Sequence, residues 1–311
     1  MSVDMAEEED SKDRFQLAMV DHAIVYLLDK PAGGNMIDQA VITYCVCDEI
    51  TKILRIRDDC QCKMTSAEVM TFAILSATLF GCDYRRTHLI TRCHKYFPKI
   101  LSHSQIIRWI HQIPENAWMM VFFALQIFLR DKEQKFFIID SFPVKAYENH
   151  KSFRAKIFTG KKYHGYTASK KQYFFGIKVH MVVDINGVPI EFSFTPASVS
   201  DIKGLRNLSL SLPEQSILLG DRAYTDYNFE NYLLEFKKIK LIAKRKQNHK
   251  KQHSSQDNFC LAILRNRIET AFSSIISRIP KHIKVRTEKG FYLKVLFFIL
   301  AYMINLYFPL T

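Results

Sequence analysis

Three acidic residues are spaced so that they could hold a metal ion together: Asp140, Asp221 and Glu269. Asp140 follows the apolar run 136–139 and Asp221 comes just after the apolar run 216–219; short runs of this kind are typical of buried strands. If these strands pair, both carboxylates lie at one end of a sheet, and a helix carrying Glu269 can pack beside them. Three carboxylates favour a hard divalent cation, Mg²⁺ or Mn²⁺. Two such ions about 3.5–4 Å apart can clamp the attacking and leaving oxygens of a phosphodiester.

The segments around these carboxylates predict a mixed α/β domain in the second half of the chain. The Asn186-Gly187 turn between two apolar stretches is a strong hairpin signal. Five strands are expected, at 136–139, 173–184, 188–195, 216–219 and 240–243, with a long polar stretch at 141–172. Helices are expected at 201–210 (or a turn there), 226–236, 259–278 and 291–308. Three strands followed by alternating helix and strand resemble the order of the RNase H fold, a mixed five-stranded sheet flanked by helices.

The first 130 residues predict an all-α region. Helical spacing and stop signals place helices at 14–29, 36–54, 66–80, 84–96, 103–112 and 114–130. Thr65 with Glu68 three residues later is a capping-box start, and Gly81 is the matching stop. Three successive short helices could form a helix-turn-helix, with the last one reading DNA. Its candidate reading residues are His103, Ser104, Gln105, Arg108 and His111. A plain helical bundle is an equally good interpretation.

Basic residues concentrate in the second half. The net charge is +13; residues 1–130 carry 14 basic and 16 acidic side chains, whereas 131–311 carry 30 and 15. This asymmetry favours a polyanionic partner. Two stretches, 145–171 and 237–251, combine cations that can grip phosphates with few or no acids, and the first also carries aromatics that can stack on bases. The predicted DNA contacts are Lys145, Arg154, Lys156, Lys161, Lys162, Lys178, Arg222, Lys244, Arg245, Lys246 and Arg265. A solvated charge run is the simpler interpretation of either stretch alone.

Five segments of the second half carry a more specific pattern: Ile139-Asp140-Ser141-Phe142-Pro143-Val144-Lys145, Tyr173-Phe174-Phe175-Gly176-Ile177-Lys178-Val179-His180, Phe194-Thr195-Pro196-Ala197 with Asp201, Gly220-Asp221-Arg222-Ala223-Tyr224, and Arg265-x-Arg267-Ile268-Glu269-x-x-Phe272. Together they resemble the DDE transposases of bacterial insertion sequences, most closely the insertion-sequence 982 family. The resemblance covers 136–311 well and the first half loosely. It implies that Asp140, Asp221 and Glu269 are the metal-binding triad.

The chain departs from related transposases around the glutamate. Many carry Tyr-x-x-Arg-x-x-x-Glu and a Lys seven residues further on. Here Arg265 is kept, but the Tyr position is Ala262 and the Lys position is Ile276. Arg278 or Lys281 are the nearest substitutes for that Lys.

The cysteines and the start of the chain favour a reducing compartment. The chain has seven Cys, an odd number, and the acidic start MSVDMAEEED is unlike a secretory signal. The pairs Cys45-x-Cys47 and Cys60-x-Cys62 suggest zinc, but paired zinc ligands usually stand two to four residues apart. Free, partly buried thiols are therefore expected.

Two apolar runs need a membrane test. The run 117–129 has 13 residues and the run 295–310 has 16, whereas a spanning helix needs about 20. We therefore expect 291–308 to be a buried helix of the catalytic domain, packed on the 259–278 helix. A C-terminal membrane anchor is the alternative.

Taken together, the sequence predicts a helical domain at 1–130 that binds DNA and a catalytic RNase H-like domain at 131–311. The predicted function is a transposase that binds the terminal inverted repeats of its element, cleaves them and joins 3′ ends to target DNA by two-metal phosphoryl transfer. The expected cofactor is Mg²⁺ or Mn²⁺, with two ions, and the expected assembly on DNA is a homodimer or higher. The expected location is the cytoplasm, with no membrane partner. Two alternatives stay open: another RNase H-like nuclease, and a catalytically decayed DNA-binding protein.

Overall fold

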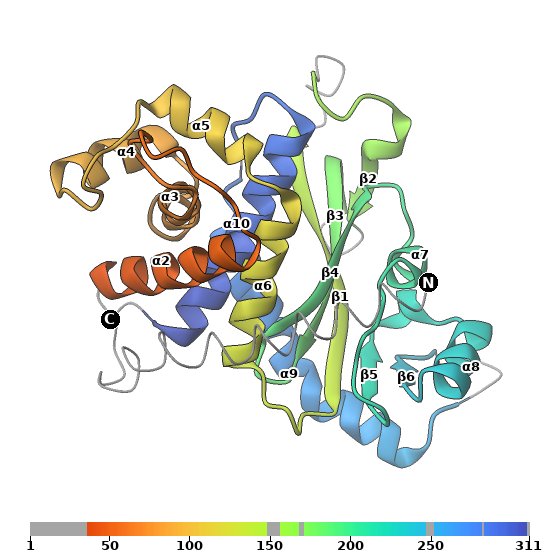
Figure 1. Cartoon of the computed structure of the whole chain (residues 1–311). Helices are drawn as coiled ribbons and strands as arrows, with labels where there is room; N and C mark the ends of the chain where they lie inside the picture. The colour runs from red at the N-terminus through yellow and green to blue at the C-terminus, as the bar shows by residue number, and fades with distance from the viewer. Residues whose placement is uncertain (1–35, 148–155, 168–170, 247–251, 282, 310–311) are drawn as a thin grey trace. The chain divides into compact units, whose positions relative to one another are not determined.

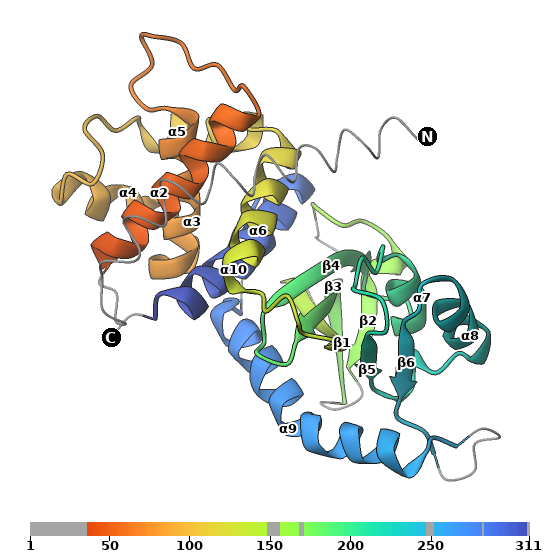
Figure 2. The ribbon, with the colours of Figure 1, turned by 60° about the horizontal axis from the view of Figure 1, so that its bottom comes forward.

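The computed structural model describes residues 36–147, 156–167, 171–246, 252–281 and 283–309, and the side chains of 264–269 and 271 lie outside this description. The chain forms two compact units (Figures 1 and 2): Met1–Leu129 with Leu293–Thr311, here called the helical unit, and Arg130–Tyr292, here called the sheet unit. The predicted helix 14–29 lies outside the described residues.

The described helices of the helical unit begin and end close to where local signals predict. They are α2 (Met36–Ile53), α3 (Ser66–Phe80), α4 (Tyr84–Cys93), α5 (His103–Gln112) and α6 (Glu115–Leu129). The Thr65 side chain accepts the Glu68 N–H while the Glu68 carboxylate accepts the Thr65 N–H, which is the predicted capping box. Gly81 ends α3 in the left-handed conformation, with φ of 56°. Capping chemistry therefore fixes both ends of α3.

The last helix, α10 (Glu288–Tyr307), is buried as predicted, and most of it groups with the helical unit. From Leu293 on, it belongs to the helical unit and not to the sheet unit. Phe297 packs against Trp118 of α6, with ring centroids 4.7 Å apart, and Lys294 Nζ donates to the Cys82 carbonyl at 3.0 Å. This grouping differs from the predicted boundary at residue 130, and the packing of α10 on the 259–278 helix stays a prediction.

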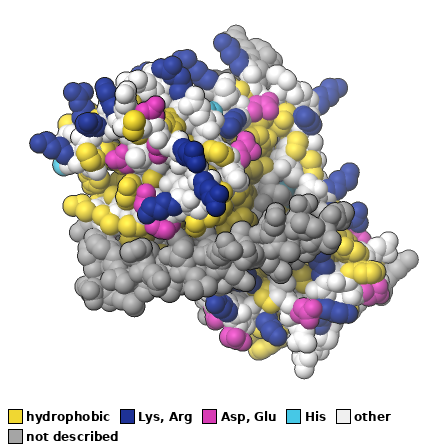
Figure 3. Space-filling model, viewed as in Figure 1, with side chains coloured by type: hydrophobic (Ala, Val, Ile, Leu, Met, Phe, Trp, Pro, Cys, Tyr) yellow, Lys and Arg dark blue, Asp and Glu magenta, His cyan; other side chains and the backbone are white. Residues whose placement is uncertain are grey.

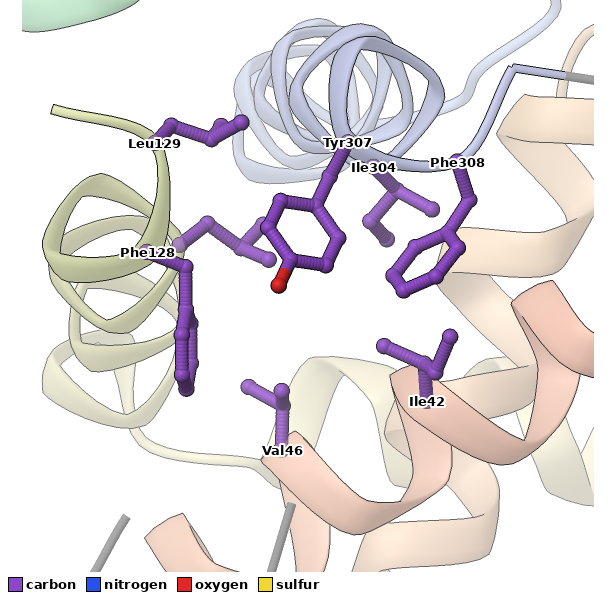
Figure 4. Close-up of a pocket in the computed structure, with 8 residues that line it drawn as sticks. Ile42, Val46, Phe128, Leu129, Ile304, Tyr307 and Phe308 are labelled. Carbon is purple, nitrogen blue, oxygen red and sulfur yellow. The ribbon is translucent and has the colours of Figure 1, made fainter. Parts of the chain in front are cut away.

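The C-terminal end of α10 closes a small apolar cavity inside the helical unit (Figure 4). The cavity measures about 10 Å³. Its lining comes from α2, α6 and the end of α10: Ile42, Val46, Leu125, Phe128, Leu129, Ile304, Tyr307 and Phe308. Among the described residues, α10 alone is long and apolar enough to cross a membrane, and 78% of its most apolar window is buried.

The sheet unit is built on a six-stranded mixed sheet. The strands are β1 (Phe136–Tyr147), β2 (His164–Thr167), β3 (Gln172–Asp184), β4 (Pro189–Pro196), β5 (Ile217–Gly220) and β6 (Lys240–Ala243). The order is β2-β3-β1-β5-β6, with β4 also paired to β3. β1 runs antiparallel to β3 and parallel to β5, and β5 runs parallel to β6. Without β2, the order is the RNase H-like one expected from the sequence.

Two details of the sheet differ from the sequence prediction. The first strand does not end at Asp140 but continues to Tyr147, because the 13-residue β3 pairs with it along this length. Pro143 is tolerated there because β5 pairs only with Phe136–Ile138, so the other side of β1 is an edge at that point. The sixth strand, β2, lies in the stretch predicted to be polar and irregular, and it adds to the first residues of β3.

Helices cover both faces of the sheet. The described connecting helices are α7 (Asp201–Arg206), α8 (Tyr227–Phe236) and α9 (Ser255–Arg278). Neighbouring residues on a strand point to opposite faces. Ser141 pairs with His180 and lies on the face covered by α7, whereas Phe142 contacts Phe272 of α9, with centroids 6.3 Å apart. Asp140 therefore shares its sheet face with α9.

Candidate active site

Asp140 occupies the middle strand of the sheet. Its Oδ1 accepts the N–H of Ser141 at 2.7 Å. Burial raises the pKa of Asp140 to about 7; the Ser141 hydrogen bond opposes the rise, and the negative charges of Asp221 and Asp201 add to it. This carboxylate is thus held at a site where its negative charge is poorly compensated by the chain.

Asp221 directly follows the neighbouring strand β5 and lies at the same level as Asp140. Ile138 pairs with Leu219 in the parallel β1–β5 ladder, so Asp140 and Asp221 each stand two residues beyond that pair. The Asp221 Oδ1 accepts the Ala223 N–H at 2.8 Å. Burial raises its pKa as well; the Ala223 bond opposes this and the charge of Asp201 adds to it. This register places the two aspartates at the same level, just beyond the last β1–β5 pair, while β1 itself continues to Tyr147.

Glu269 lies in α9, and its side chain is outside the described part of the chain. The helix itself is anchored by the contact between Phe272 and Phe142. Phe142 stands two residues after Asp140 on the same face of β1, and Phe272 stands three residues after Glu269. Among the side chains that are described, no three His, Cys, Asp or Glu gather closely enough to hold a metal ion.

A second group of polar side chains meets at β1, and none of its members is among the catalytic residues predicted from the sequence. Ser141 Oγ donates to Asp201 Oδ1 at 2.7 Å. Lys178 Nζ donates to the same oxygen at 3.2 Å and to the Val199 carbonyl at 3.0 Å. The hydroxyl of Tyr224 is buried nearby, and burial together with the surrounding carboxylates raises its pKa. Asp201 belongs to one of the segments behind the family resemblance, which was the available signal.

The predicted DNA-contacting cations divide into three groups. Those exposed at the surface of the sheet unit are Lys145, Lys156, Lys161, Lys162, Arg222, Lys244 and Lys246. Two are engaged inside the chain instead: Lys178 with Asp201, and Arg245, which pairs with Glu230 and covers the Tyr227 ring at 5.0 Å. Arg154 and the side chain of Arg265 lie outside the described residues. Lys and Arg side chains are scattered over the face drawn in Figure 3, including over the helical unit.

The candidate reading helix α5 is amphipathic in the way the sequence predicts. Ile106 and Ile110 are buried. The outer side carries Ser104, Gln105 and Arg108, which are exposed, while His103 and His111 are half-buried. This arrangement is compatible with both the helix-turn-helix and the plain bundle.

The helical unit also contains a groove of about 580 Å³ between α2, α3 and the segment 94–98. Its lining is mostly apolar, with Tyr44, Glu68 and Lys95 among the polar residues. It lies in the helical unit, whereas the carboxylates belong to the sheet unit.

All seven cysteines are free thiols, as predicted. Burial raises the pKa of Cys47 and of Cys82 to about 12, so these two thiols are protonated at neutral pH.

Two comparisons with known proteins bear on this site. The family model described as "Transposase DDE domain" matches residues 131–306. In three dimensions the chain is similar to a piggyBac transposase, solved by cryo-electron microscopy as a synaptic complex with hairpin DNA. The TM-score is 0.51 at 10% sequence identity, covering 88% of this chain and 74% of that one. No curated protein is similar enough to count as a match. The expected fold class is confirmed, and the narrower assignment to the insertion-sequence 982 family stays a prediction.

Proposed function

This chain belongs to the transposase DDE domain family, and from that premise we propose that it acts on the ends of its own mobile element. It binds the terminal inverted repeats, cleaves the DNA there, and joins the 3′ ends to target DNA. Both reactions are phosphoryl transfers, in which water attacks first and a 3′-hydroxyl attacks second.

The observation that carries this proposal is the pair Asp140 and Asp221. Asp140 lies on β1 and Asp221 directly follows the adjacent parallel strand β5 at the same level, and burial raises the pKa of each. Two neighbouring carboxylates with raised pKa values are typical of a functional site, because a purely structural role would favour pairing each with a cation.

The donor chemistry of the pair fits a hard divalent cation. Both side chains offer carboxylate oxygens, which Mg²⁺ and Mn²⁺ prefer, and a cation would offset the charge that raises the pKa of Asp140. We expect two ions, held by Asp140, Asp221 and Glu269. When bound, they would supply positive charge against the phosphate oxygens on which negative charge builds during the reaction.

The rest of the chain binds and orients DNA in this proposal. The exposed cations Lys161, Lys162, Lys244 and Lys246 supply phosphate contacts. Arg265 orients Glu269 or touches phosphate. In the helical unit, α5 reads the terminal repeats with Arg108 and its neighbours. The protein acts in the cytoplasm as a homodimer or larger assembly, because two element ends must be joined together.

The test is a cleavage and joining assay with the full-length protein. Its substrate is the DNA flanking the coding region, which should contain short inverted repeats on both sides. The variants Asp140→Asn, Asp221→Asn and Glu269→Gln should each lower the cleavage rate by about 10²–10³-fold or more, with DNA affinity and folding retained. The matched control is Asp257→Asn, which removes a carboxylate paired with Lys240 at the other end of the sheet.

The outcomes separate the alternatives. Loss of cleavage in the three variants but not in the control supports the proposal, and near-wild-type cleavage by any of the three contradicts the assignment of that residue. Cleavage without joining to a second duplex would indicate an RNase H-like nuclease. DNA binding without cleavage by the wild type, in Mg²⁺ or Mn²⁺, would indicate a decayed DNA-binding protein.

A further inference from the structure

Ser141 links two carboxylates on opposite sides of β1. Its backbone N–H donates to Asp140 Oδ1 at 2.7 Å, and its side-chain Oγ donates to Asp201 Oδ1 at 2.7 Å. Both bonds are made by one residue in a strand, where successive side chains point to opposite faces. A shift of Ser141 toward or away from Asp201 therefore also moves the N–H that holds Asp140.

Lys178 fixes the far end of this link. Its Nζ donates to Asp201 Oδ1 at 3.2 Å and to the Val199 carbonyl at 3.0 Å. The side chains of Lys178 and Asp201 are 17% and 23% exposed, whereas the surface pair formed by Lys52 and Asp48 has exposures of 61% and 32%. A more enclosed, charge-assisted bond is stronger and less screened than a surface ion pair.

The backbone of the sheet adds rigidity. Lys178 pairs with Pro143 in the β1–β3 ladder, two residues from Ser141. The α7 helix brings Asp201 to the same face, where Gly204 packs on His180. Lys178, Asp201 and Ser141 thus belong to three elements, β3, α7 and β1, that are held together at one point.

Asp201 is engaged inside this network and is not placed like a metal ligand. Its Oδ1 accepts from both Ser141 and Lys178. Together with Asp140 and Asp221 it does not form a group of three that could hold an ion within the described side chains. Lys178 Nζ lies 3.2 Å from the Asp201 carboxylate and offsets part of its negative charge.

We propose that Asp201 is a positioning residue for Asp140. With Lys178 it holds Ser141 in place, and the Ser141 N–H holds the Asp140 carboxylate in the orientation that its function requires. This inference rests on the proposed function of Asp140. It also gives Lys178 a role other than the DNA contact expected from the sequence.

The first experiment compares Asp201→Asn with Asp257→Asn. Each replaces an aspartate that lies in the first turn of a helix and pairs with a lysine. The readouts are the cleavage rate and the affinity for Mn²⁺ alone, measured by calorimetry on the full chain. Loss of a partner behind a metal-binding carboxylate costs about 10–100-fold in affinity or activity. Asp201→Asn should lose that much, and Asp257→Asn should match the wild type.

The second experiment tests the link through Ser141. Ser141→Ala removes the hydroxyl and should lower cleavage and Mn²⁺ affinity by about 10-fold or more. Ser141→Thr keeps a hydroxyl and should restore most of both. A purely structural role would not distinguish these variants by their affinity for Mn²⁺, provided that their unfolding midpoints agree.

The third experiment is a double-mutant cycle between Lys178→Met and Asp201→Asn. If Lys178 acts through Asp201, the double variant should cleave no more slowly than the worse single variant, because residues in one network are not additive. Lys178→Met should also leave the salt dependence of DNA binding unchanged. Loss of one phosphate contact would instead lower its slope by about 0.9, the change expected for Lys162→Ala.

Each other outcome overturns the inference. Asp201→Asn with wild-type cleavage and Mn²⁺ affinity would mean that Asp201 positions nothing. A loss of Mn²⁺ binding as complete as in Asp140→Asn would make Asp201 a ligand. Additive effects in the cycle, or a smaller salt slope for Lys178→Met, would make Lys178 a DNA contact. Failure of the proposed function is separate, since it would appear as an inactive wild type or an active Asp140→Asn.

Discussion

The imidazole ring of His180 lies where a side chain on Gly204 would begin. A Cβ on Gly204 would come within 2.2 Å of the His180 Cε1 and 2.3 Å of each ring nitrogen. His180 is on β3 and Gly204 is on α7. Absence of a side chain at position 204 therefore lets α7 approach the sheet closely enough for Asp201, three residues earlier, to reach Ser141.

Gly204→Ala should destabilise the sheet unit. An added methyl group that meets a fully buried ring forces the helix or the ring to move, which typically costs about 1–3 kcal/mol. Urea unfolding followed by circular dichroism measures this cost. Lys203→Ala, on the exposed side of the same helix, should change stability by no more than about 0.5 kcal/mol. Equal stability of the two variants would show that α7 does not depend on this contact.

His180 should make the free energy of unfolding decrease at acid pH. Burial lowers its pKa to about 4, below the ordinary 6.5. Between these values the unfolded chain binds a proton and the folded chain does not. The contribution of neutral His180 to the free energy of unfolding is fully present above about pH 6.5. It is lost as the pH falls toward 4, by about 1.4 kcal/mol per pH unit.

His180→Gln provides the comparison for this effect. It keeps a nitrogen that can bond to Thr195 Oγ1, which accepts or donates to His180 Nε2 at 2.8 Å, but it has no titrating ring. The raised pKa of Asp140 acts in the opposite direction and is common to both proteins, so it cancels. The difference in unfolding free energy between wild type and variant should shrink as the pH falls from 6.5. Parallel pH profiles would rule out a neutral, buried His180.

Phe297→Ala should destabilise the helical unit. Phe297 is fully buried against Trp118, and removing a buried aromatic ring leaves a cavity that costs about 3–5 kcal/mol. Both tryptophans, Trp109 and Trp118, belong to this unit, so tryptophan fluorescence during urea unfolding reports on it directly. Leu306→Ala, at a 36% exposed position of the same helix, should cost less than about 1 kcal/mol. Similar losses in the two variants would contradict the described packing of α10.

DNA binding should weaken steeply with salt. If the basic surface neutralises 6–10 phosphates, affinity should fall by about 10³–10⁵-fold between 50 and 200 mM salt. Lys161 and Lys162 are both exposed, and replacing both with Ala should lower the slope by about 1.8 if each contacts one phosphate. Fluorescence anisotropy with a labelled duplex measures the slope. Lys52→Ala is the control, because Lys52 pairs with Asp48 and Glu49, and a flat salt dependence would contradict the predicted interface.

Helix ends and turns were predictable because they depend on neighbouring residues. Features that depend on contacts between distant segments of the chain were not. The capping box at Thr65 and the Asn186-Gly187 turn act within a few residues, so the sequence placed them correctly. The extension of β1 past Asp140 was missed because it depends on pairing with β3, which no local pattern records. The meeting of Asp140 with Asp221 was predictable because each comes within two residues of the end of a short apolar run, and these two runs pair as parallel strands.

The composition did not predict which Lys and Arg side chains pair with carboxylates of the chain itself. Arg245 lies in a basic stretch and Lys178 in an apolar strand, and each was expected to contact DNA. Lys178 is instead held by Asp201, 23 residues away, after α7 docks on the sheet. Arg245 pairs with Glu230 of α8, and this contact depends on how β6 follows that helix.

The chain passes between the two units twice, and this limits how the protein can be recombined with its relatives. The chain leaves that unit at the end of α6, forms the sheet unit, and comes back through α10. In terms of chain connectivity, the sheet unit is an insertion into the helical one. A chimera that exchanges the sheet unit alone must therefore be joined at two points, near Leu129 and near Leu293. A single crossover at residue 130 would separate α6 from Phe297, its partner in α10.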